Sequence, residues 1–310
     1  MSALTAGTTG ARSRRRAARR PVAGGGNAPY VFIAPFYLLY VLFMVVPVLA
    51  ALYLSLTEWV GLGTPTIVGL RNYADLAQDT SFHGALGNTA IYVLVSLLIV
   101  VPSALLIAQA LNSRGLRGRD LFRVAYFVPM VLSPIVIALV FGMLLDRDYG
   151  IVNSLLFALF GSPPLDWVTD PTLAKVTISF VILWRWVGYL TIFFLAALQN
   201  VPHELYEAAE LDGAGAFRRF TTVTLPAIQP VTAFVLVTSF IGSAQIFDEV
   251  YLITRGGPGE ATLSVSMFIY RAAFERQQFG YAAAAGVVLF VIVFAVSRLL
   301  NRALKIGRAS

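Results

Sequence analysis

A few charged side chains lie inside long apolar stretches, and they are the first candidates for chemistry. Arg185 stands between Trp184 and Trp186 near the middle of an apolar run, and Asp248 and Glu249 lie near the end of a later one. An ionised group inside a bilayer is costly unless it faces protein or water. At ~1.5 Å per helical residue, the depths of the two sets differ by roughly 9 Å, so they could meet.

Two interpretations of these residues remain open from the sequence. They could line a polar cavity that takes up a solute by hydrogen bonds and by stacking on an aromatic ring. Alternatively, Arg185 makes a structural ion pair that holds two helices together, as intramembrane charges commonly do. The predicted cavity residues are Arg185, Tyr189, Ser239, Gln245, Asp248 and Glu249.

The residue types that common catalytic and metal sites need are scarce. Lysine occurs only at 175 and 305, preceded by Ala174 and Leu304, so the Gly-Lys-Ser/Thr element of a phosphate-binding loop is missing. There is no cysteine, and the only histidines, His83 and His203, fall in different predicted loops. We therefore expect no catalytic residue, no metal site and no cofactor in this chain.

A polar, helix-forming segment from Pro202 to Pro226 separates two of the apolar runs. Pro202 suits the start of a helix, and the negative charges of Glu204 and Glu207 would interact favourably with the positive end of the helix dipole. Gly213 can then adopt the left-handed backbone conformation that ends many helices. The pattern predicts two short helices joined by a sharp turn, with a narrow face of small residues on the first.

The spacing within this segment is specific. Glu207-Ala208-Ala209, then three residues, Gly213, nine residues, Val223, one residue and Leu225-Pro226 resembles the EAA loop of the membrane-spanning subunits of binding-protein-dependent ABC importers. Valine stands at 223 where that family usually has isoleucine, and both are β-branched. The family's frequent Asp-Gly-Ala is matched at 212–214. The resemblance implies that ATPase coupling involves Glu207, Ala208, Ala209, Asp212, Gly213, Ala214, Leu225 and Pro226.

A second segment, from Phe247-Asp248 through Thr254-Arg255-Gly256-Gly257-Pro258, is similar to the carbohydrate-uptake branch of that family, on the side of its maltose-type first membrane subunit. The resemblance implies an importer subunit for a sugar, an amino sugar or a glycerol phosphodiester, located in the bacterial plasma (inner) membrane. Its implied partners are a second homologous permease, two ABC ATPase subunits that bind ATP and Mg²⁺, and an extracytoplasmic solute-binding protein.

The composition requires a membrane. Hydrophobic residues make up 58% of the 310 residues, charged residues 13%, and the mean hydropathy is +0.76, so there is too little polar surface to cover a soluble globule. Spans in lipid pair their backbone groups internally, which favours helices. We expect an all-α transmembrane protein with the six-helix type I ABC importer permease fold, with spans near 30–54, 88–112, 122–145, 173–198, 229–254 and 280–303 and an EAA loop over 199–228.

The basic residues predict the orientation. Six arginines lie in the tail 1–29, which we expect to be disordered, and others follow in 113–123, in the EAA loop and at the C-terminus. Sixteen of the 23 Lys and Arg residues then share one side with both termini, and six lie on the other. By the positive-inside rule both termini, including the tail 304–310, and the EAA loop face the cytoplasm. The basic charge thus reflects membrane topology, not nucleic-acid binding.

Two other classes of membrane protein compete with this interpretation. A gradient-driven secondary transporter would need two related halves with broken helices, and we find no convincing repeat. A non-transporting membrane scaffold would have no use for the constrained segment around Gly213.

Overall fold

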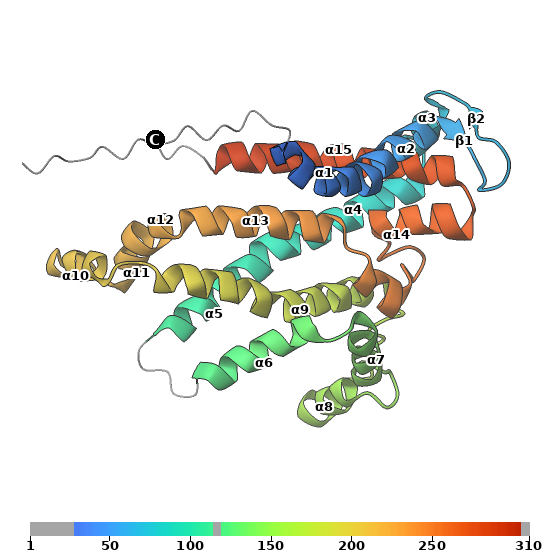
Figure 1. Ribbon diagram of the computed structural model, residues 1–310. Helices are drawn as coiled ribbons and strands as arrows, with labels where there is room; N and C mark the ends of the chain where they lie inside the picture. Colours follow the sequence, from blue (N-terminus) through green and yellow to red (C-terminus); the bar gives the residue numbers. More distant parts are fainter. Residues whose placement is uncertain (1–27, 114–118, 305–310) are drawn as a thin grey trace, which may run out of the picture. The chain divides into compact units, whose positions relative to one another are not determined.

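The computed structural model describes residues 28–113 and 119–304, and it is almost entirely helical (Figure 1). The predicted tail 1–29 falls almost wholly outside these residues, as do most of the basic loop after Asn112 and the last six residues. The chain divides into two compact units, Met1–Val48 and Leu49–Ser310. The first contains α1 (Ala28–Tyr40), the π-helical turn η1 (Val41–Val45) and the start of α2 (Val46–Ser55).

The second unit begins within α2 and holds all the remaining elements. A small antiparallel pair, β1 (Thr57–Glu58) and β2 (Thr66–Ile67), follows α2, with Thr57 opposite Ile67. The helices and π-helical turns that come next are α3 (Arg71–Leu76), α4 (Thr80–Val95), η2 (Ser96–Val100), α5 (Val101–Asn112), α6 (Arg119–Val131), α7 (Pro134–Leu144), α8 (Ile151–Phe160), α9 (Pro171–Gln199), α10 (His203–Leu211), α11 (Ala216–Arg219), η3 (Phe220–Thr224), α12 (Leu225–Ala227), α13 (Gln229–Ala244), η4 (Val250–Thr254), α14 (Val265–Tyr270), η5 (Arg271–Glu275) and α15 (Phe279–Ala303).

Several helices are long and apolar enough to cross a bilayer. Among the described residues, four continuous stretches qualify, Tyr30–Ser55, Thr80–Asn112, Pro171–Gln199 and Phe279–Ala303, and the number rises to six if two bent helix pairs each count as one span. These helices also expose many large apolar side chains, among them Leu98, Leu139, Met143 and Phe290. Exposed apolar surface on this scale is expected where lipid tails, not water, surround the protein.

Capping residues fix where two of the long helices begin. The Asp79 carboxylate accepts hydrogen bonds from the backbone N–H groups of Ser81 and Phe82 at the start of α4. Asp170 does the same for Thr172 and Leu173 at the start of α9, directly before Pro171. Such caps satisfy N–H groups that a helix leaves unpaired at its first turn.

The stretch 122–145, predicted as one span, is broken in the structure. Helices α6 and α7 meet at an angle of 108°. Ser133 is extended, with φ −60° and ψ 137°, because a residue directly before proline is disfavoured in the helical conformation and Pro134 opens α7. Helix α6 also approaches α9 closely: a Cβ on Gly188 would lie 1.7 Å from the carbonyl oxygen of Tyr126.

The stretch 229–254 is also not a single helix. Helix α13 ends at Ala244, and the chain runs without helical structure through Ile246 and Phe247 before a helical turn resumes. The Ser264 hydroxyl donates a hydrogen bond of 2.7 Å to the Ile246 carbonyl oxygen, which the broken helix leaves without a helical partner. The break is thus stabilised by the chain that follows it.

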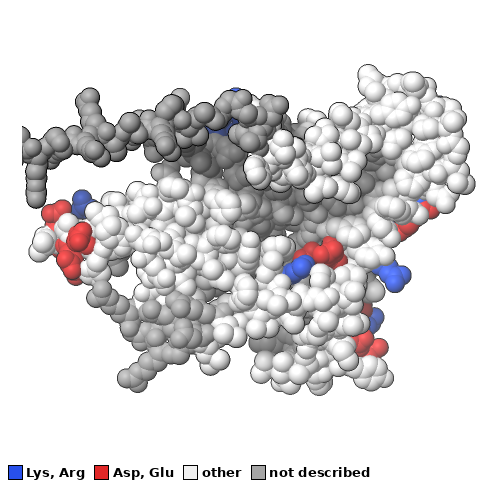
Figure 2. All heavy atoms as spheres, viewed as in Figure 1, with Lys and Arg blue, Asp and Glu red and all other residues white. Residues whose placement is uncertain are grey.

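The second unit has two distinct ends (Figure 1). One end carries α10, α11 and α12 together with the end of α5 and the end of α15, and the Gln229 amide there donates a hydrogen bond to the Leu304 carbonyl. The opposite end carries β1, β2, α3, α7 and α14. Charged atoms gather over α10 and α11, and much of the remaining described surface in this view is uncharged (Figure 2).

Candidate functional site

A cavity of about 300 Å³ lies between α9, α13 and the broken segment after α13. All six predicted cavity residues line it, although they come from positions 64 residues apart in the sequence. They are Arg185, Tyr189, Ser239, Gln245, Asp248 and Glu249. The depth argument concerned only Arg185, Asp248 and Glu249, and the role of all six residues in binding a solute remains a prediction.

The Arg185 guanidinium is buried and paired. Its Nη1 lies 2.8 Å from Glu249 Oε1 and 4.0 Å from Asp248 Oδ2. The Glu249 side chain is only 6% exposed, whereas that of Asp248 is 50% exposed. Trp186 contributes an indole N–H 3.4 Å from the same Glu249 oxygen, and its ring lies 5.4 Å from the guanidinium carbon. Arg185 and Glu249 thus form the ion pair between helical segments that the sequence left as an alternative.

Some polar groups of the cavity have no hydrogen-bond partner among the described residues. The Ser239 hydroxyl and the Arg185 Nε are buried without a hydrogen bond. Asp248 and Gln245 are exposed to the cavity, and the described part of the chain offers the Gln245 amide no hydrogen bond. A buried donor or acceptor without a partner costs free energy, so a ligand with hydroxyl groups would be stabilised here.

Aromatic rings form the cavity wall beside these groups. Trp186 and Tyr189 lie one turn apart on α9 with their ring centroids 6.0 Å apart, and Phe247 lies in the broken segment. A pocket with apolar and aromatic walls and a few fixed polar groups is typical of a small-molecule site. Sequence analysis missed Trp186 and Phe247 as cavity residues; the indole next to an intramembrane arginine was the available signal.

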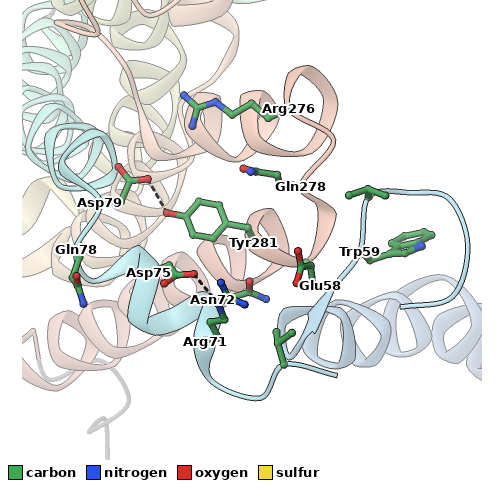
Figure 3. A pocket seen from close by; sticks show the side chains of 13 residues that line it. Glu58, Trp59, Arg71, Asn72, Asp75, Gln78, Asp79, Arg276, Gln278 and Tyr281 are labelled. Carbon is green, nitrogen blue, oxygen red and sulfur yellow. Dashed lines mark hydrogen bonds and ion pairs between the residues drawn. The ribbon is translucent and has the colours of Figure 1, made fainter. Parts of the chain in front are cut away.

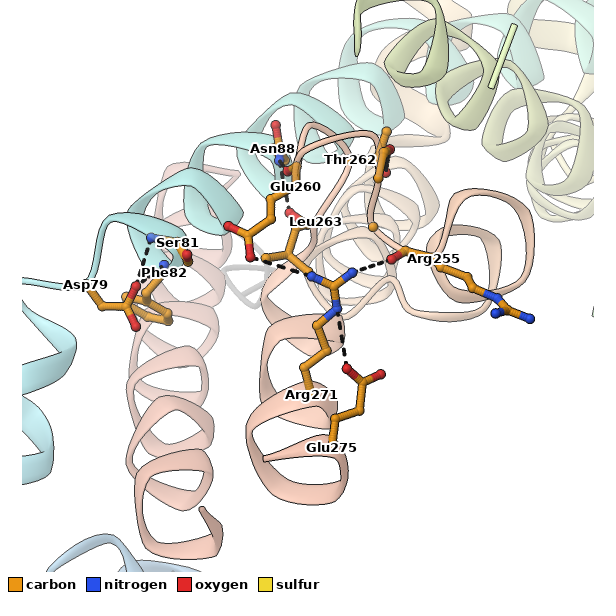
Figure 4. A network of polar contacts seen from close by, with 12 residues as sticks. Asp79, Ser81, Phe82, Asn88, Arg255, Glu260, Thr262, Leu263, Arg271 and Glu275 are labelled. Carbon is orange, nitrogen blue, oxygen red and sulfur yellow. Dashed lines mark hydrogen bonds and ion pairs between the residues drawn. The ribbon is translucent and has the colours of Figure 1, made fainter. Parts of the chain in front are cut away.

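The irregular backbone at 245–247 lies partly in protein contacts and partly at the cavity. Non-helical chain at membrane depth is tolerated only where it is buried in protein or lines a water-filled cavity. The loop that follows is anchored to α4: the Asn88 amide donates to the carbonyls of Glu260 and Leu263. Arg271 extends from the next helical segment to Glu260, Glu275 and the backbone carbonyl of Arg255 (Figure 4).

The second candidate site is the segment α10 to α12 at the other end of the unit. Gly213 has φ +73°, which confirms the predicted left-handed turn, and the Ala214 N–H donates to the Ala209 carbonyl oxygen. The helix starts at His203 with Pro202 just before it, one residue later than predicted.

Two contacts fold this segment into one compact piece. Arg219 Nη1 lies 3.1 Å from Glu210 Oε2, and the hydroxyls of Tyr206 and Thr224 are 3.0 Å apart. Its surface is open: Leu211 is 90% exposed and Phe217 80%. Of the predicted coupling residues, Ala209 and Ala214 are half-buried, and the exposed ones are Glu207, Ala208, Asp212, Gly213, Leu225 and Pro226.

The described residues were also compared with the arrangement that a metal ion needs. Among the described residues, no three His, Asp or Glu side chains are arranged to hold a metal ion. The cavity places an arginine and two carboxylates beside several hydroxyl groups, an arrangement suited to binding a polar solute.

Comparison with known proteins decides the family. Residues 100–305 match the model of the binding-protein-dependent transport system inner membrane component. The lactose transport system permease protein LacF of Rhizobium radiobacter is 40% identical over 272 residues, covering 86% of this chain and 91% of LacF. This chain belongs to the binding-protein-dependent importer permeases.

Other permeases of the family are similarly related. The arabinooligosaccharides transport system permease protein AraP of Bacillus subtilis is 36% identical over 272 residues, covering 87% of this chain and 86% of AraP. The fold agrees with a crystal structure of a bacterial ABC transporter involved in the import of alginate: the TM-score is 0.79 at 24% identity, over 91% of this chain and 96% of that one.

Membership of this permease family settles several expectations. The chain is an integral membrane subunit of an ATP-driven importer with the expected all-α permease fold. It is not an enzyme, and ATP hydrolysis belongs to partner subunits. A gradient-driven secondary transporter and a non-transporting scaffold are therefore excluded.

Proposed function

We propose that this permease carries a neutral carbohydrate, a di- or oligosaccharide, through the cavity between α9 and α13. The observation that carries the proposal is that the six predicted residues, two of which have a buried polar atom without a partner, share one cavity of about 300 Å³ with the rings of Trp186 and Phe247. Sugars combine hydroxyl groups with an apolar ring face, so they match both kinds of lining. The names of the related permeases support the same class: lactose, arabinooligosaccharides and diacetylchitobiose.

Within the cavity, the side chains divide into two roles. Gln245, Asp248 and Ser239 hydrogen-bond to sugar hydroxyls, while Tyr189 stacks on the ring. Arg185 and Glu249 mainly stabilise the wall of the cavity, because each already neutralises the charge of the other across a distance of 2.8 Å. The half-exposed Asp248 is the carboxylate that remains available to a solute.

We further propose the assembly and orientation of the importer. A second homologous permease forms the other half of the pathway, and two ABC ATPase subunits, which bind ATP and Mg²⁺, dock on α10 to α12. An external solute-binding protein delivers the carbohydrate to the opposite end of the unit. Both termini and α10 to α12 then face the cytoplasm, with the protein in the plasma (inner) membrane, and the bias of the basic residues toward that side supports this orientation. Exposed Leu211 and Phe217 at a polar end support the docking role, since they are the kind of surface a partner covers.

Uptake of a panel of disaccharides tests the proposed solute class. The assembled importer with its binding protein is reconstituted in vesicles and supplied with radiolabelled lactose, trehalose, maltose, arabinobiose or diacetylchitobiose. We expect ATP-dependent uptake of at least one of these disaccharides.

Variants of the cavity residues test the site. Gln245→Ala should raise the half-saturation concentration or lower the uptake rate by about twofold to tenfold, which corresponds to the loss of one hydrogen bond. Gln109→Ala, on α5 outside the cavity and also exposed, should not. Unchanged uptake by the Gln245, Ser239 and Asp248 variants would refute the cavity.

The coupling role has its own test. Gly213→Pro cannot adopt φ +73° and loses the N–H that donates to Glu210, so α10 should turn differently and ATP hydrolysis should continue with at least tenfold less uptake. Gly215→Pro is the matched control, because Gly215 has φ −66°, which proline adopts. Uptake that stays coupled in the Gly213 variant would contradict the proposal.

A further inference from the structure

A second and larger cavity (Figure 3) is lined by residues of β1 and α3, which lie at the end of the unit opposite α10 to α12 (Figure 1). Its volume is about 600 Å³. It is formed by β1, by α3, by the chain leading into α4, and by the segment from Arg276 to Tyr281 at the start of α15. This cavity is separate from the one between α9 and α13, since the two share no lining residue.

Most of the side chains that line this outer cavity can donate or accept hydrogen bonds. Figure 3 shows Glu58, Asn72, Asp75 and Tyr281 around a common space. Some of these groups are already engaged: the Tyr281 hydroxyl donates to Asp79 Oδ2 at 2.7 Å, and the Asn72 amide nitrogen donates to two backbone carbonyls. Four lining side chains make no hydrogen bond or ion pair with any described residue: Glu58, Gln78, Arg276 and Gln278.

The charges of the lining favour a neutral ligand with many hydroxyl groups. Three carboxylates and two guanidinium groups share the cavity wall, so neither sign dominates. A hydroxyl group can donate to Glu58 and accept from Arg276, and an amide such as Gln78 or Gln278 can do either. The volume lies within the range of roughly 300–1,000 Å³ typical of small-molecule sites.

A series of neighbouring aromatic rings connects this outer cavity to the inner one. Phe279 follows the lining residue Gln278, and its ring lies 5.4 Å from that of Trp59, another lining residue. Successive ring centroids then lie 5.2 to 6.0 Å apart, and none of the rings is fully buried. The series runs through Phe279, Phe274, Tyr270 and Phe247, and the last lines the inner cavity.

We propose that the outer cavity is a receiving subsite, which binds one or two sugar units of the carbohydrate before they pass along these rings to the inner cavity. The inference rests on the proposed carbohydrate function. Free polar groups hold the hydroxyls at the outer end, and the partly exposed ring faces offer apolar surface on which the sugar ring moves inward. The subsite belongs to the permease itself and is distinct from the external binding protein.

The test uses whichever of the five disaccharides the uptake screen identifies. Its binding to the purified importer, without binding protein or nucleotide, is measured by equilibrium dialysis in a Gln245→Ala background, where the inner cavity is weakened. Adding Gln78→Ala and Gln278→Ala should lower the remaining affinity about fivefold or more, from the loss of two hydrogen bonds. Both glutamines are exposed and unpartnered, so the fold should tolerate the change. His83→Ala, exposed at the same end but outside the cavity, is the control.

Each other outcome overturns part of the reasoning. If Gln245→Ala impairs uptake while the Gln78 and Gln278 variants bind and transport normally, the receiving subsite is wrong and the proposed function stands. If those variants keep their sugar affinity but lose stimulation of ATPase activity by the binding protein, the cavity is a protein-docking surface instead. If none of the disaccharides is taken up by the unaltered importer, the carbohydrate function fails, and this inference with it.

Discussion

Removing the Glu249 carboxylate should be one of the most damaging single changes in the membrane region. In Glu249→Ala, the Arg185 guanidinium loses its partner at 2.8 Å and keeps only Asp248, 4.0 Å away. Breaking a buried ion pair by removing one partner costs about 3–5 kcal/mol, because the remaining charge is left uncompensated. Asp248→Ala should lower the free energy of unfolding by no more than about 1 kcal/mol, because the Asp248 side chain is half-exposed and its carboxylate lies farther from the Arg185 guanidinium than that of Glu249 does.

The assay is a double-variant cycle on the free energy of unfolding, measured in mixed micelles of mild detergent and SDS. Replacing both members, Arg185→Leu with Glu249→Leu, should cost far less than Glu249→Ala alone, because no buried charge is then left without a partner. The reasoning is refuted if Asp248→Ala costs as much as Glu249→Ala. It is equally refuted if the costs of the two single leucine variants simply add in the double variant.

Two further predictions concern close contacts of the backbone. Gly188→Ala should destabilise the protein by about 3 kcal/mol or more, because its Cβ would meet the Tyr126 carbonyl oxygen; Gly142→Ala, with open space around it, should be neutral in the same thermal unfolding measurement. Ser264→Ala should cost about 1–3 kcal/mol, because the Ile246 carbonyl loses its only described hydrogen-bond donor. Normal stability of the Ser264 variant would mean that water satisfies that carbonyl.

Sequence patterns predicted the helical architecture because the apolar runs are long and the bilayer allows little else. They also brought Arg185 and Glu249 together, since residue rise along a helix gives depth directly. The turn at Gly213 was equally predictable, because only a residue without Cβ adopts a φ of +73° at little cost in free energy. These features depend on residues close to one another in the sequence or on the membrane, so they can be predicted from a single sequence.

Features that depend on contacts between distant segments were missed. The break after Ala244 is stabilised by Ser264, eighteen residues from Ile246, and an apolar run does not show where such support exists. Helix α8 fell within a predicted loop, as a ten-residue apolar helix is too short to read as a span. The outer cavity was not foreseen either, because its polar residues are scattered between Glu58 and Tyr281 and meet only in the fold.

The position of α10 to α12 in the chain is consistent with the coupling role proposed for this segment. Helix α9 runs unbroken from the cavity to Gln199, directly before α10, and α13 begins at Gln229, directly after α12. Tyr189 lies ten residues before Gln199, the end of α9, which corresponds to about 15 Å of helix. The two helices that form the cavity walls are thus the two that α10 to α12 connect. A displacement of this segment by a docked ATPase would change the separation of α9 and α13, and with it the width of the cavity, without any signal passing through the remaining helices.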